Sequence, residues 1–509
     1  MKKTYIDTAM ERIAPDLILK GGNVVDVFSG RVIKADVIIK DGIICGVGSY
    51  SGENEQDVSG KYIMPGFIDS HVHIESSMTQ PSEYAKAVMP HGITTVIADP
   101  HEITNVCGED GLEFMLKSAK NIPLDVNLML PSCVPATPFE HTGANLDAKT
   151  TQKLAPKFFG IGEMMNYPGI VSGDDETLGK LCLDIIDGHA PLLSGHELDA
   201  YASAGIKTDH ECSVVEEMTE KISKGMYILL REGTLSLDVA KLIKGVTPYT
   251  LRRCAFCTDD RFVGEIIRDG SIDHCIRKAV SLGLNNIDAI IMATLNACEI
   301  YGMKNKGAIA PSYIADIVVA DDLNLSSISQ VYKNGKLVCE NGKALFECET
   351  VDNSKVTNTV HLPKISADFF KTDVKDKFDA IELIPESIIT KKVTVSYSDS
   401  LSKVCVIERH HNLGTKGIGF VTNYGITNGA IATSIGHDSH NVIVIGDNDS
   451  DMALAVNTLG TSGGIAVCSE GKVIASMTLD IAGLMSVKSA DEVTREHDNL
   501  YSAAKVLNI

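Results

Sequence analysis

The sequence predicts an α/β protein: a TIM-like (β/α)8 barrel, a small β-sandwich built from both flanks of the barrel, and an additional C-terminal α+β domain. Eight strand-like runs, with helix-like segments between several of them, lie between residues 63 and 304. Short β-branched runs separated by glycine-rich turns stand on both sides of this region. Eight βα units in about 240 residues are typical of a barrel.

The chain is expected to contain more than one domain, because its 509 residues exceed one ordinary hydrophobic core. Residues 1–62 and 305–360 are predicted to form the two parts of the β-sandwich. Residues 63–304 would form the barrel. Residues 361–509 alternate strand-like and helical runs after a Lys-rich passage, and we expect them to form a C-terminal domain that contributes to the active site.

Nearly every predicted barrel strand ends in a polar or ionisable residue. The eight ends are Asp69, Asp99, Pro131, Glu163, His189, His210, Glu232 and Asp259. Segments 82–89 and 214–224 are examples of the predicted helices between them. Barrel enzymes carry their catalytic groups at the C-terminal ends of the strands, so these side chains are expected to share one face.

Composition excludes several classes of function. The net charge of −21 argues against a nucleic-acid-binding surface, which needs clustered Lys and Arg. The N-terminal residues lack the apolar core of a signal peptide, and no run of about 18 apolar residues would span a membrane. Thirteen scattered cysteines indicate a reduced, cytoplasmic protein with free thiols. The isolated Cys254-x-x-Cys257 is interpreted as part of a buried strand rather than a redox or zinc motif.

Two histidines, His71 and His73, follow the first barrel strand at alternate positions. Residues i and i+2 of a strand point to the same side, so both imidazoles are expected to reach one metal ion. Further candidates follow strands 4, 5, 6 and 8. The predicted ligands are His71, His73, Glu163, His189, His210 and Asp259. Any one such histidine is more often structural, but the coincidence of all six at strand ends favours one or two divalent first-row ions, with Glu163 as a bridge.

Asp259 is also predicted to move protons. A carboxylate beside a metal-activated water can take its proton and then protonate the leaving group. The adjacent Asp260 is the competing assignment. Because neighbours on a strand point in opposite directions, we expect only one of the two to face the metals.

Two polar turns complete the candidate site. Asp99 and Glu102 lie in the turn after strand 2 and either supply groups at the barrel mouth or merely cap a helix. His437 and His440 either complete the pocket from the C-terminal domain or lie in an ordinary turn. Arg231 and Glu232 are weaker candidates.

The P-G-F-I-D-x-H-x-H motif at residues 65–73, with its split β-sandwich, resembles the amidohydrolase superfamily. Longer stretches narrow the resemblance to the bacterial adenine deaminases and cover nearly the whole chain. These stretches are residues 73–78, 99–106, 162–169, 187–191, 209–211, 231–233, 257–261, 437–441 and 481–486.

The resemblance implies that adenine is hydrolysed to hypoxanthine and ammonia, in purine salvage or catabolism, by attack of a metal-bridged hydroxide on C6. It places the ligands on the six residues above and the proton shuttle on Asp259. It also implies a purine pocket at Asp99, Glu102, His437 and His440. We hypothesise that Glu102 protonates a ring nitrogen.

The cofactor implied by the resemblance is two Mn2+ ions per subunit, with Fe2+ or Zn2+ as alternatives. The partners would be a purine base and a second subunit in a homodimer, with no nucleic acid and no membrane. One feature departs from the family. Its members continue past the region of residues 481–486 with an apolar segment and a tail, whereas this chain ends at Ile509. Three explanations are open: the chain is a shorter natural variant, it is truncated, or its last domain is weakened.

Three other functions are less well supported. Cyclic-amide hydrolases of the same superfamily often carry a carboxylated Lys on strand 4, where this chain has Glu163, with Lys157 before the strand. Zinc deaminases of nucleic-acid bases need a P-C-x-x-C motif, which this sequence lacks. A sequence that lacked one of the ligands would favour a metal-binding scaffold without catalytic activity. This sequence has a metal-binding residue at all six positions.

Overall fold

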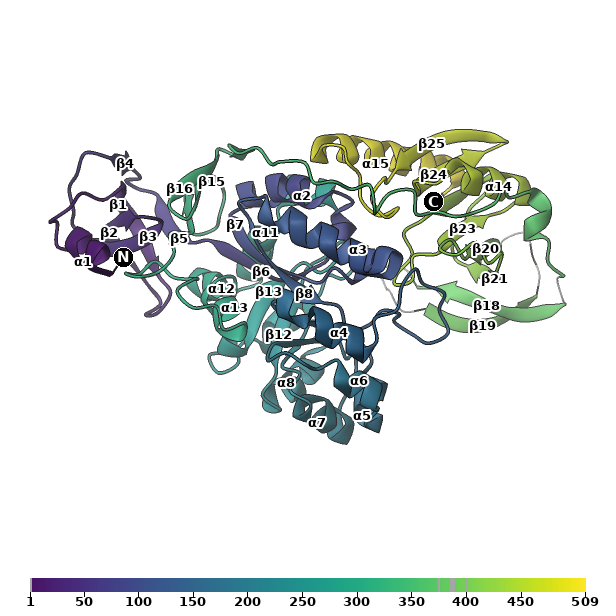
Figure 1. Ribbon diagram of the computed structural model, residues 1–509, viewed down its shortest axis with the longest axis horizontal. Helices are drawn as coiled ribbons and strands as arrows, with labels where there is room; N and C mark the ends of the chain where they lie inside the picture. Colours follow the sequence, from purple (N-terminus) through teal and green to yellow (C-terminus); the bar gives the residue numbers. More distant parts are fainter. Residues whose placement is uncertain (1, 374–375, 385–389, 397, 399–400) are drawn as a thin grey trace.

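The computed structural model describes residues 2–373, 376–384, 390–396, 398 and 401–509. Figure 1 shows three parts along the long axis of the molecule: the sheet of the N-terminal segment, a central barrel and a C-terminal domain. In the described part of the chain, no helix is both long and apolar enough to cross a membrane.

The first part is a nine-stranded sheet that takes strands from both flanks of the barrel, as predicted. Its order is β17-β16-β15-β14-β5-β1-β2-β3, with β4 paired to β1. The flanks meet where β5 pairs antiparallel with β14, with Ile63 opposite Val319. The strands are β1 Leu17–Asp26, β2 Arg31–Lys40, β3 Ile43–Gly48, β4 Glu55–Asp57, β5 Tyr62–Pro65, β14 Ile317–Ala320, β15 Ile328–Lys333, β16 Lys336–Glu340 and β17 Lys343–Ala344. Helix α1 (Lys2–Ala9) packs beside β3.

The barrel contains all eight predicted strands, and they are parallel. They are β6 Phe67–Val72, β7 Ile93–Ala98, β8 Asp125–Leu130, β9 Gly160–Met164, β10 Ile186–Gly188, β11 Thr208–Asp209, β12 Tyr227–Arg231 and β13 Cys254–Cys257. The first strand runs three residues beyond its predicted end at Asp69. Apolar strand residues pack in buried clusters, with Val96, Leu128 and Ile228 in one and Ile68 and Leu229 in another.

The barrel closes through two seams between a five-stranded and a three-stranded sheet. At one seam Val72 bridges Asp259 in parallel, and the His73 N–H donates to the Asp259 carbonyl at 3.1 Å. At the other, the Lys207 N–H donates to the Ile186 carbonyl at 3.4 Å. Closure brings the C-terminal ends of the first and last strands side by side, which is the geometric basis of the site.

Helices surround the barrel (Figure 1). The predicted segments 82–89 and 214–224 correspond to α2 and α8. The helices are α2 Pro81–Val88, α3 His101–Lys120, α4 Ala148–Leu154, α5 Tyr167–Ser172, α6 Asp175–Gly179, α7 Gly195–Ser203, α8 Val215–Ser223, α9 Val239–Leu242, α10 Val263–Asp269, α11 Ile272–Ser281, α12 Asn286–Met292 and α13 Leu295–Ile300. Helix α11 shows why such segments fold: its buried Ile272, Cys275, Ile276 and Ala279 recur at helical spacing on one face.

The C-terminal domain is an eight-stranded sheet in the order β19-β18-β21-β20-β23-β22-β24-β25. Helix α14 covers one face with Met452 and Val456 against Val444. The Lys-rich passage 364–392 includes β18, and its residues 374–375 and 385–389 lie outside the described residues. The elements are β18 Lys377–Leu383, β19 Thr390–Ser396, β20 Ser402–Ile407, β21 Lys416–Thr422, β22 Gly429–Thr433, β23 Val442–Gly446, α14 Asp449–Thr458, β24 Gly464–Ser469, β25 Lys472–Thr478 and α15 Ala490–Ala504.

The C-terminal domain docks directly on the barrel. Helix α15 packs against α2 and α10. The segment before it pairs with the loop after β6, where the Ser486 N–H donates to the Met78 carbonyl at 2.9 Å and Thr79 bridges Ser486. This docking carries the turn 436–441 to the end of the barrel where the candidate ligands lie.

Candidate metal centre

The six predicted ligands meet at the C-terminal end of the barrel. His71 lies on β6 and His73 directly after it, and their Nε2 atoms are 3.2 Å apart. The His73 Nε2 lies 3.3 Å from Glu163 Oε1 and 3.1 Å from Asp259 Oδ1. Three strands, β6, β9 and β13, thus contribute to one cluster.

His189 and His210 complete the cluster on its other side. The His189 Nδ1 lies 2.5 Å and the His210 Nε2 3.2 Å from Glu163 Oε2. The His210 ring stacks on that of His71, with ring centroids 4.1 Å apart. The two oxygens of Glu163 therefore face different histidines.

The Asp99 loop orients two of these ligands from behind. The His73 Nδ1 lies 2.8 Å from the Asp99 carbonyl oxygen, so this nitrogen carries the proton and Nε2 keeps its lone pair for the centre. The Asp99 carboxylate accepts a hydrogen bond from the Glu163 N–H at 2.8 Å. A Cβ at Gly162 would stand 2.1 Å from the same Asp99 oxygen, which explains the glycine before Glu163.

The electrostatics of the cluster favour a cation at its centre. Burial alone would lower the pKa of His71, but the carboxylates of Asp187 and Asp259 raise it to about 10. Burial alone would raise the pKa of Glu163, but His189 and the other surrounding imidazoles hold it well below its usual range. The carboxylates thus stabilise positive charge at the centre of the cluster. The donor atoms are carboxylate oxygens and imidazole nitrogens, which suit a divalent transition ion.

Asp259 and Asp260 both lie near the cluster. Strand β13 ends at Cys257, and Asp259 has a left-handed φ of 58°, so the alternation of strand side chains no longer applies. One carboxylate oxygen of each residue lies within 4.8 Å of a ring nitrogen of His73. Asp259 also faces His71 at 3.4 Å, whereas Asp260 accepts a 2.5 Å hydrogen bond from Ser76.

Arg231 is a buried cation beside Asp259. Its Nη1 lies 2.9 Å from Asp259 Oδ2, and its guanidinium also contacts Glu211 and Asp238. Asp259 therefore has one oxygen held by Arg231 and the other directed at the histidines. Glu232 lies elsewhere: it forms an ion pair with Lys278.

His101 belongs to the site, although the sequence did not single it out among the ligands. Its ring is buried, with Nδ1 3.3 Å from Glu163 Oε1 and Nε2 3.2 Å from Glu102 Oε1. The one feature of the sequence that points to His101 is its position in the Asp99–Glu102 turn, directly after strand 2. The direction in which the His101 ring points depends on the backbone conformation where α3 begins. The spacing of residues in the sequence does not predict that conformation.

Glu102 receives both histidines of the C-terminal domain. The His437 Nδ1 lies 2.7 Å from Oε1, and the His440 Nε2 contacts Oε2. Burial alone would raise the pKa of Glu102, but the charges of His437, His440 and His101 hold it well below its usual range. The two predicted turns, far apart in the sequence, thus form one cluster.

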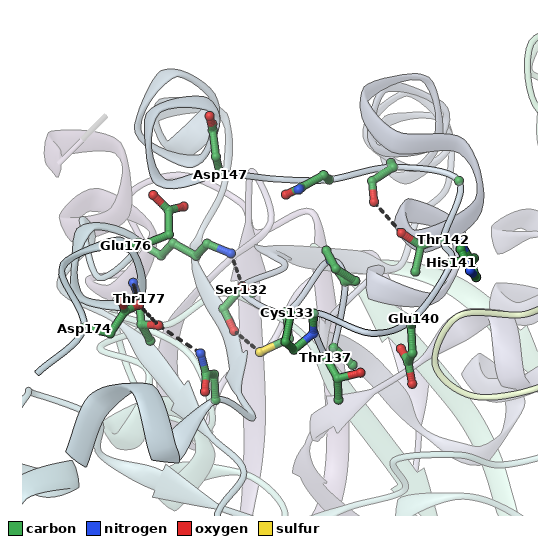
Figure 2. Close-up of a pocket in the computed structure, with 18 of the residues that line it drawn as sticks. Ser132, Cys133, Thr137, Glu140, His141, Thr142, Asp147, Asp174, Glu176 and Thr177 are labelled. Atoms are coloured by element: carbon green, nitrogen blue, oxygen red, sulfur yellow. Dashed lines mark hydrogen bonds between the residues drawn. The ribbon is translucent and has the colours of Figure 1, made fainter. Parts of the chain in front are cut away.

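A cavity of about 990 Å³ lies over the ends of β8 and β9, between the loop 131–147 and helices α5 and α6. Figure 2 shows Ser132 and Cys133 at its centre and Glu140 below the loop. Ser132 Oγ donates to the Glu163 carbonyl at 2.6 Å, so the cavity floor adjoins a predicted ligand. The Asn441 Nδ2 donates to the His141 carbonyl at 2.8 Å, which places this end of the cavity beside the turn 436–441.

Lys157 and the Cys254-x-x-Cys257 motif both lie outside the candidate site. Lys157 is exposed and pairs with Glu113 at 3.9 Å, away from the ligands, so it cannot serve as a carboxylated bridging lysine. Cys254 and Cys257 are buried on β13, in agreement with the strand interpretation. All thirteen cysteines are free thiols.

The sequence comparisons agree on one family. A sequence model described as "Amidohydrolase family" matches residues 62–338, and one described as "Adenine deaminase C-terminal domain" matches residues 383–509. The chain is 46% identical to an adenine deaminase of Clostridium acetobutylicum, over 99% of this chain and 91% of the relative. It is 44% identical to adenine deaminase 2 of Desulfotalea psychrophila over the same shares. Among solved structures, a beta-aspartyl dipeptidase from Fervidobacterium islandicum AW-1 aligns with a TM-score of 0.48 and 20% identity, over 66% of this chain and 99% of that one.

Proposed function

The chain belongs to the amidohydrolase family and, within it, to the adenine deaminases, and we propose how its residues hydrolyse the C–N bond at C6 of adenine. The reaction adds water to adenine and yields hypoxanthine and ammonia. The observation that supports the assignment of residues is the convergence of Glu163, Asp259 and four histidines at one end of the barrel. The family uses divalent metal, and the donor set fits it.

We infer that two ions bind per subunit, with Mn2+ as the cofactor and Fe2+ or Zn2+ as alternatives. The six residues that would hold them are His71, His73, Glu163, His189, His210 and Asp259. When bound, the ions supply Lewis acidity that makes water a nucleophile near neutral pH. The division of the cluster into two groups around the two oxygens of Glu163 supports a count of two.

Asp259 is the proposed proton shuttle. One oxygen, held by Arg231 at 2.9 Å, fixes the carboxylate, and the other lies 3.1–3.4 Å from the two histidines of β6. From this position Asp259 takes a proton from the attacking water and delivers it to the departing amine, which leaves as ammonia. The buried surroundings exclude bulk water from the transfer.

The purine pocket is proposed to lie between the metal centre and the turns that carry Glu102, His437 and His440. The cavity of Figure 2 would be its entrance, because its floor adjoins Glu163 and its lining residue His141 accepts a hydrogen bond from Asn441, in the turn of His437. Asp99 supports this pocket by holding the backbone of Glu163. Glu102 would contact the base or act through a neighbour.

The cellular setting is part of the same proposal. We infer a cytoplasmic enzyme of purine salvage that binds neither nucleic acid nor membrane, supported by free thiols and a net charge of −21. We also infer a homodimer, since two-fold dimers are the commonest soluble oligomers.

An ultraviolet assay tests the function. Purified Mn-loaded protein is mixed with adenine, and the formation of hypoxanthine and ammonia is followed beside an Asp259→Asn control. Turnover by the wild type that the substitution abolishes supports reaction and site together. Metal-loaded wild-type protein that leaves adenine unchanged would overturn the proposal.

A further inference from the structure

The three imidazoles around Glu102 are not equivalent. His440 is 1% exposed, its Nε2 contacts Glu102, and its Nδ1 accepts a hydrogen bond from the Gly436 N–H. His101 is 2% exposed and lies between Glu102 and Glu163. The His437 side chain is 42% exposed, and only its Nδ1 is engaged by Glu102. No residue in the described parts of the chain hydrogen-bonds to its Nε2.

This geometry gives His437 the two features of an oriented proton donor. A carboxylate that accepts from Nδ1 fixes the ring and leaves Nε2 free to meet another molecule. The position is also close to the metal centre, because a single ring, that of His101, separates Glu102 from Glu163. The cavity of Figure 2 also adjoins the turn of His437, because the carbonyl of its lining residue His141 accepts a hydrogen bond from Asn441 Nδ2 at 2.8 Å.

We propose that His437, held by Glu102, donates a proton through Nε2 to the purine ring nitrogen next to C6. This inference rests on the proposed function and assigns the donor to the C-terminal domain. Glu102 then acts through His437 and is a positioning residue. Its own carboxylate is charged among three imidazoles and has no proton to give near neutral pH.

The charges that face His437 support this role. The charge of Glu102 raises the pKa of His437 to about 10, burial opposes this rise, and the charges of Asp260 and Asp438 add to it. The imidazole is therefore an imidazolium near neutral pH, with protons on both nitrogens. Its partial exposure allows the solvent to return a proton after each cycle.

The protons balance over one turnover. The water oxygen forms a bond to C6, one water proton is released to solvent, and the His437 N–H proton moves to the ring nitrogen. The remaining proton on the new oxygen passes through Asp259 to the amine, the C6–N bond breaks and ammonia leaves. The ring keeps the proton from His437, which is the N–H of hypoxanthine, and solvent reprotonates His437.

Steady-state kinetics with adenine and 6-chloropurine test the donor role. His437→Gln in the Mn-loaded full chain is expected to lower kcat for adenine by about 10²–10⁴-fold, with KM changed only a few-fold and metal content unchanged. The loss with 6-chloropurine should be smaller, because chloride leaves readily without ring protonation. His361→Gln, an exposed histidine of the same domain, is the control and should match the wild type.

Two kinetic outcomes would overturn the proposal while leaving the proposed function intact. A His437→Gln enzyme with kcat within about threefold of the wild type would show that another group donates the proton. A loss confined to KM would show that His437 only binds the base. A wild type that does not deaminate adenine would instead contradict the proposed function.

A substrate-free measurement tests the pairing with Glu102. In zinc-loaded, 15N-histidine-labelled protein, two-bond 1H–15N spectra should show His437 as an imidazolium at about pH 8, assigned by its absence in His437→Gln. Glu102→Gln should convert this signal to neutral imidazole at the same pH and lower kcat. A neutral His437 in the wild type at this pH would overturn the proposal.

Discussion

The Nδ1 of His437 lies 2.7 Å from Oε1 of Glu102, across the boundary between the C-terminal domain and the barrel. His440, from the same turn, contacts the other oxygen of this carboxylate. A barrel residue beside the metal centre thus has both oxygens engaged by a different domain. The C-terminal domain is therefore a wall of the candidate site, and its docking on α2 and α10 positions that wall.

Replacing Asp259 is expected to separate metal binding from turnover. Asp259→Asn keeps an oxygen donor and the shape of the side chain but cannot accept the water proton. We expect metal content near that of the wild type and a fall in kcat of about 10²–10⁴-fold. Elemental analysis and the adenine assay measure the two quantities. Normal turnover in this variant would refute the shuttle assignment, and Asp260→Asn serves as the comparison.

Removing metal is expected to destabilise the fold as well as stop the reaction. The ions would bind the folded chain, in which the four imidazoles and two carboxylates converge, and not the unfolded chain, so their removal takes away this stabilisation. Dialysis against a chelator should abolish adenine turnover and lower the melting temperature, and added Mn2+ should restore both, more strongly at higher concentration. An unchanged melting temperature after verified metal loss would contradict this expectation.

Arg231 is expected to be essential for stability around Asp259. Its buried guanidinium contacts Glu211, Asp238 and Asp259, so Arg231→Gln removes the one cation that these three buried carboxylates share. We expect a loss of about 3–5 kcal/mol in the free energy of unfolding. Arg231→Lys keeps the positive charge but loses the planar guanidinium that can contact several carboxylates at once. Its free energy of unfolding should lie between those of the wild type and Arg231→Gln. Denaturant unfolding measures this order, and a Gln variant as stable as the wild type would disprove it.

A pH-dependent contribution to stability is expected from Asp273, far from the metal centre. Burial alone would raise its pKa, but His91 and Arg277 lower it to about 2. The unfolded chain, with a pKa near 3.8, then binds more protons than the folded one in this range, so stability falls as pH falls. The contribution is about 2 kcal/mol above about pH 5 and vanishes toward about pH 2.

Unfolding by urea at several pH values checks this prediction. The difference in stability between the wild type and Asp273→Asn should be largest at about pH 6 and shrink steadily toward about pH 3. A difference that stays constant, or grows, as pH falls would rule out the carboxylate as its source.

The barrel and the convergence of the six side chains at its end were predictable, because parallel strands in repeated strand–helix units all end on one face of a closed barrel. His189 and Glu163 follow different strands, but parallel strands in a closed barrel end on one face, so both side chains arrive there. The Asp259–Asp260 pair was not predictable in the same way. Its left-handed backbone lies beyond the strand, where alternation has ended.

By itself, the sequence determined the eight-stranded barrel, the flanking sheet from both of its sides and the six side chains that meet at its end. Those features follow from local periodicity, which acts over a few residues. The tertiary structure alone decided that His101 faces Glu163 and that His437 and His440 contact Glu102. These contacts depend on the start of α3 and on the docking of a separate domain, and the energy that fixes them comes from packing between segments far apart in the chain.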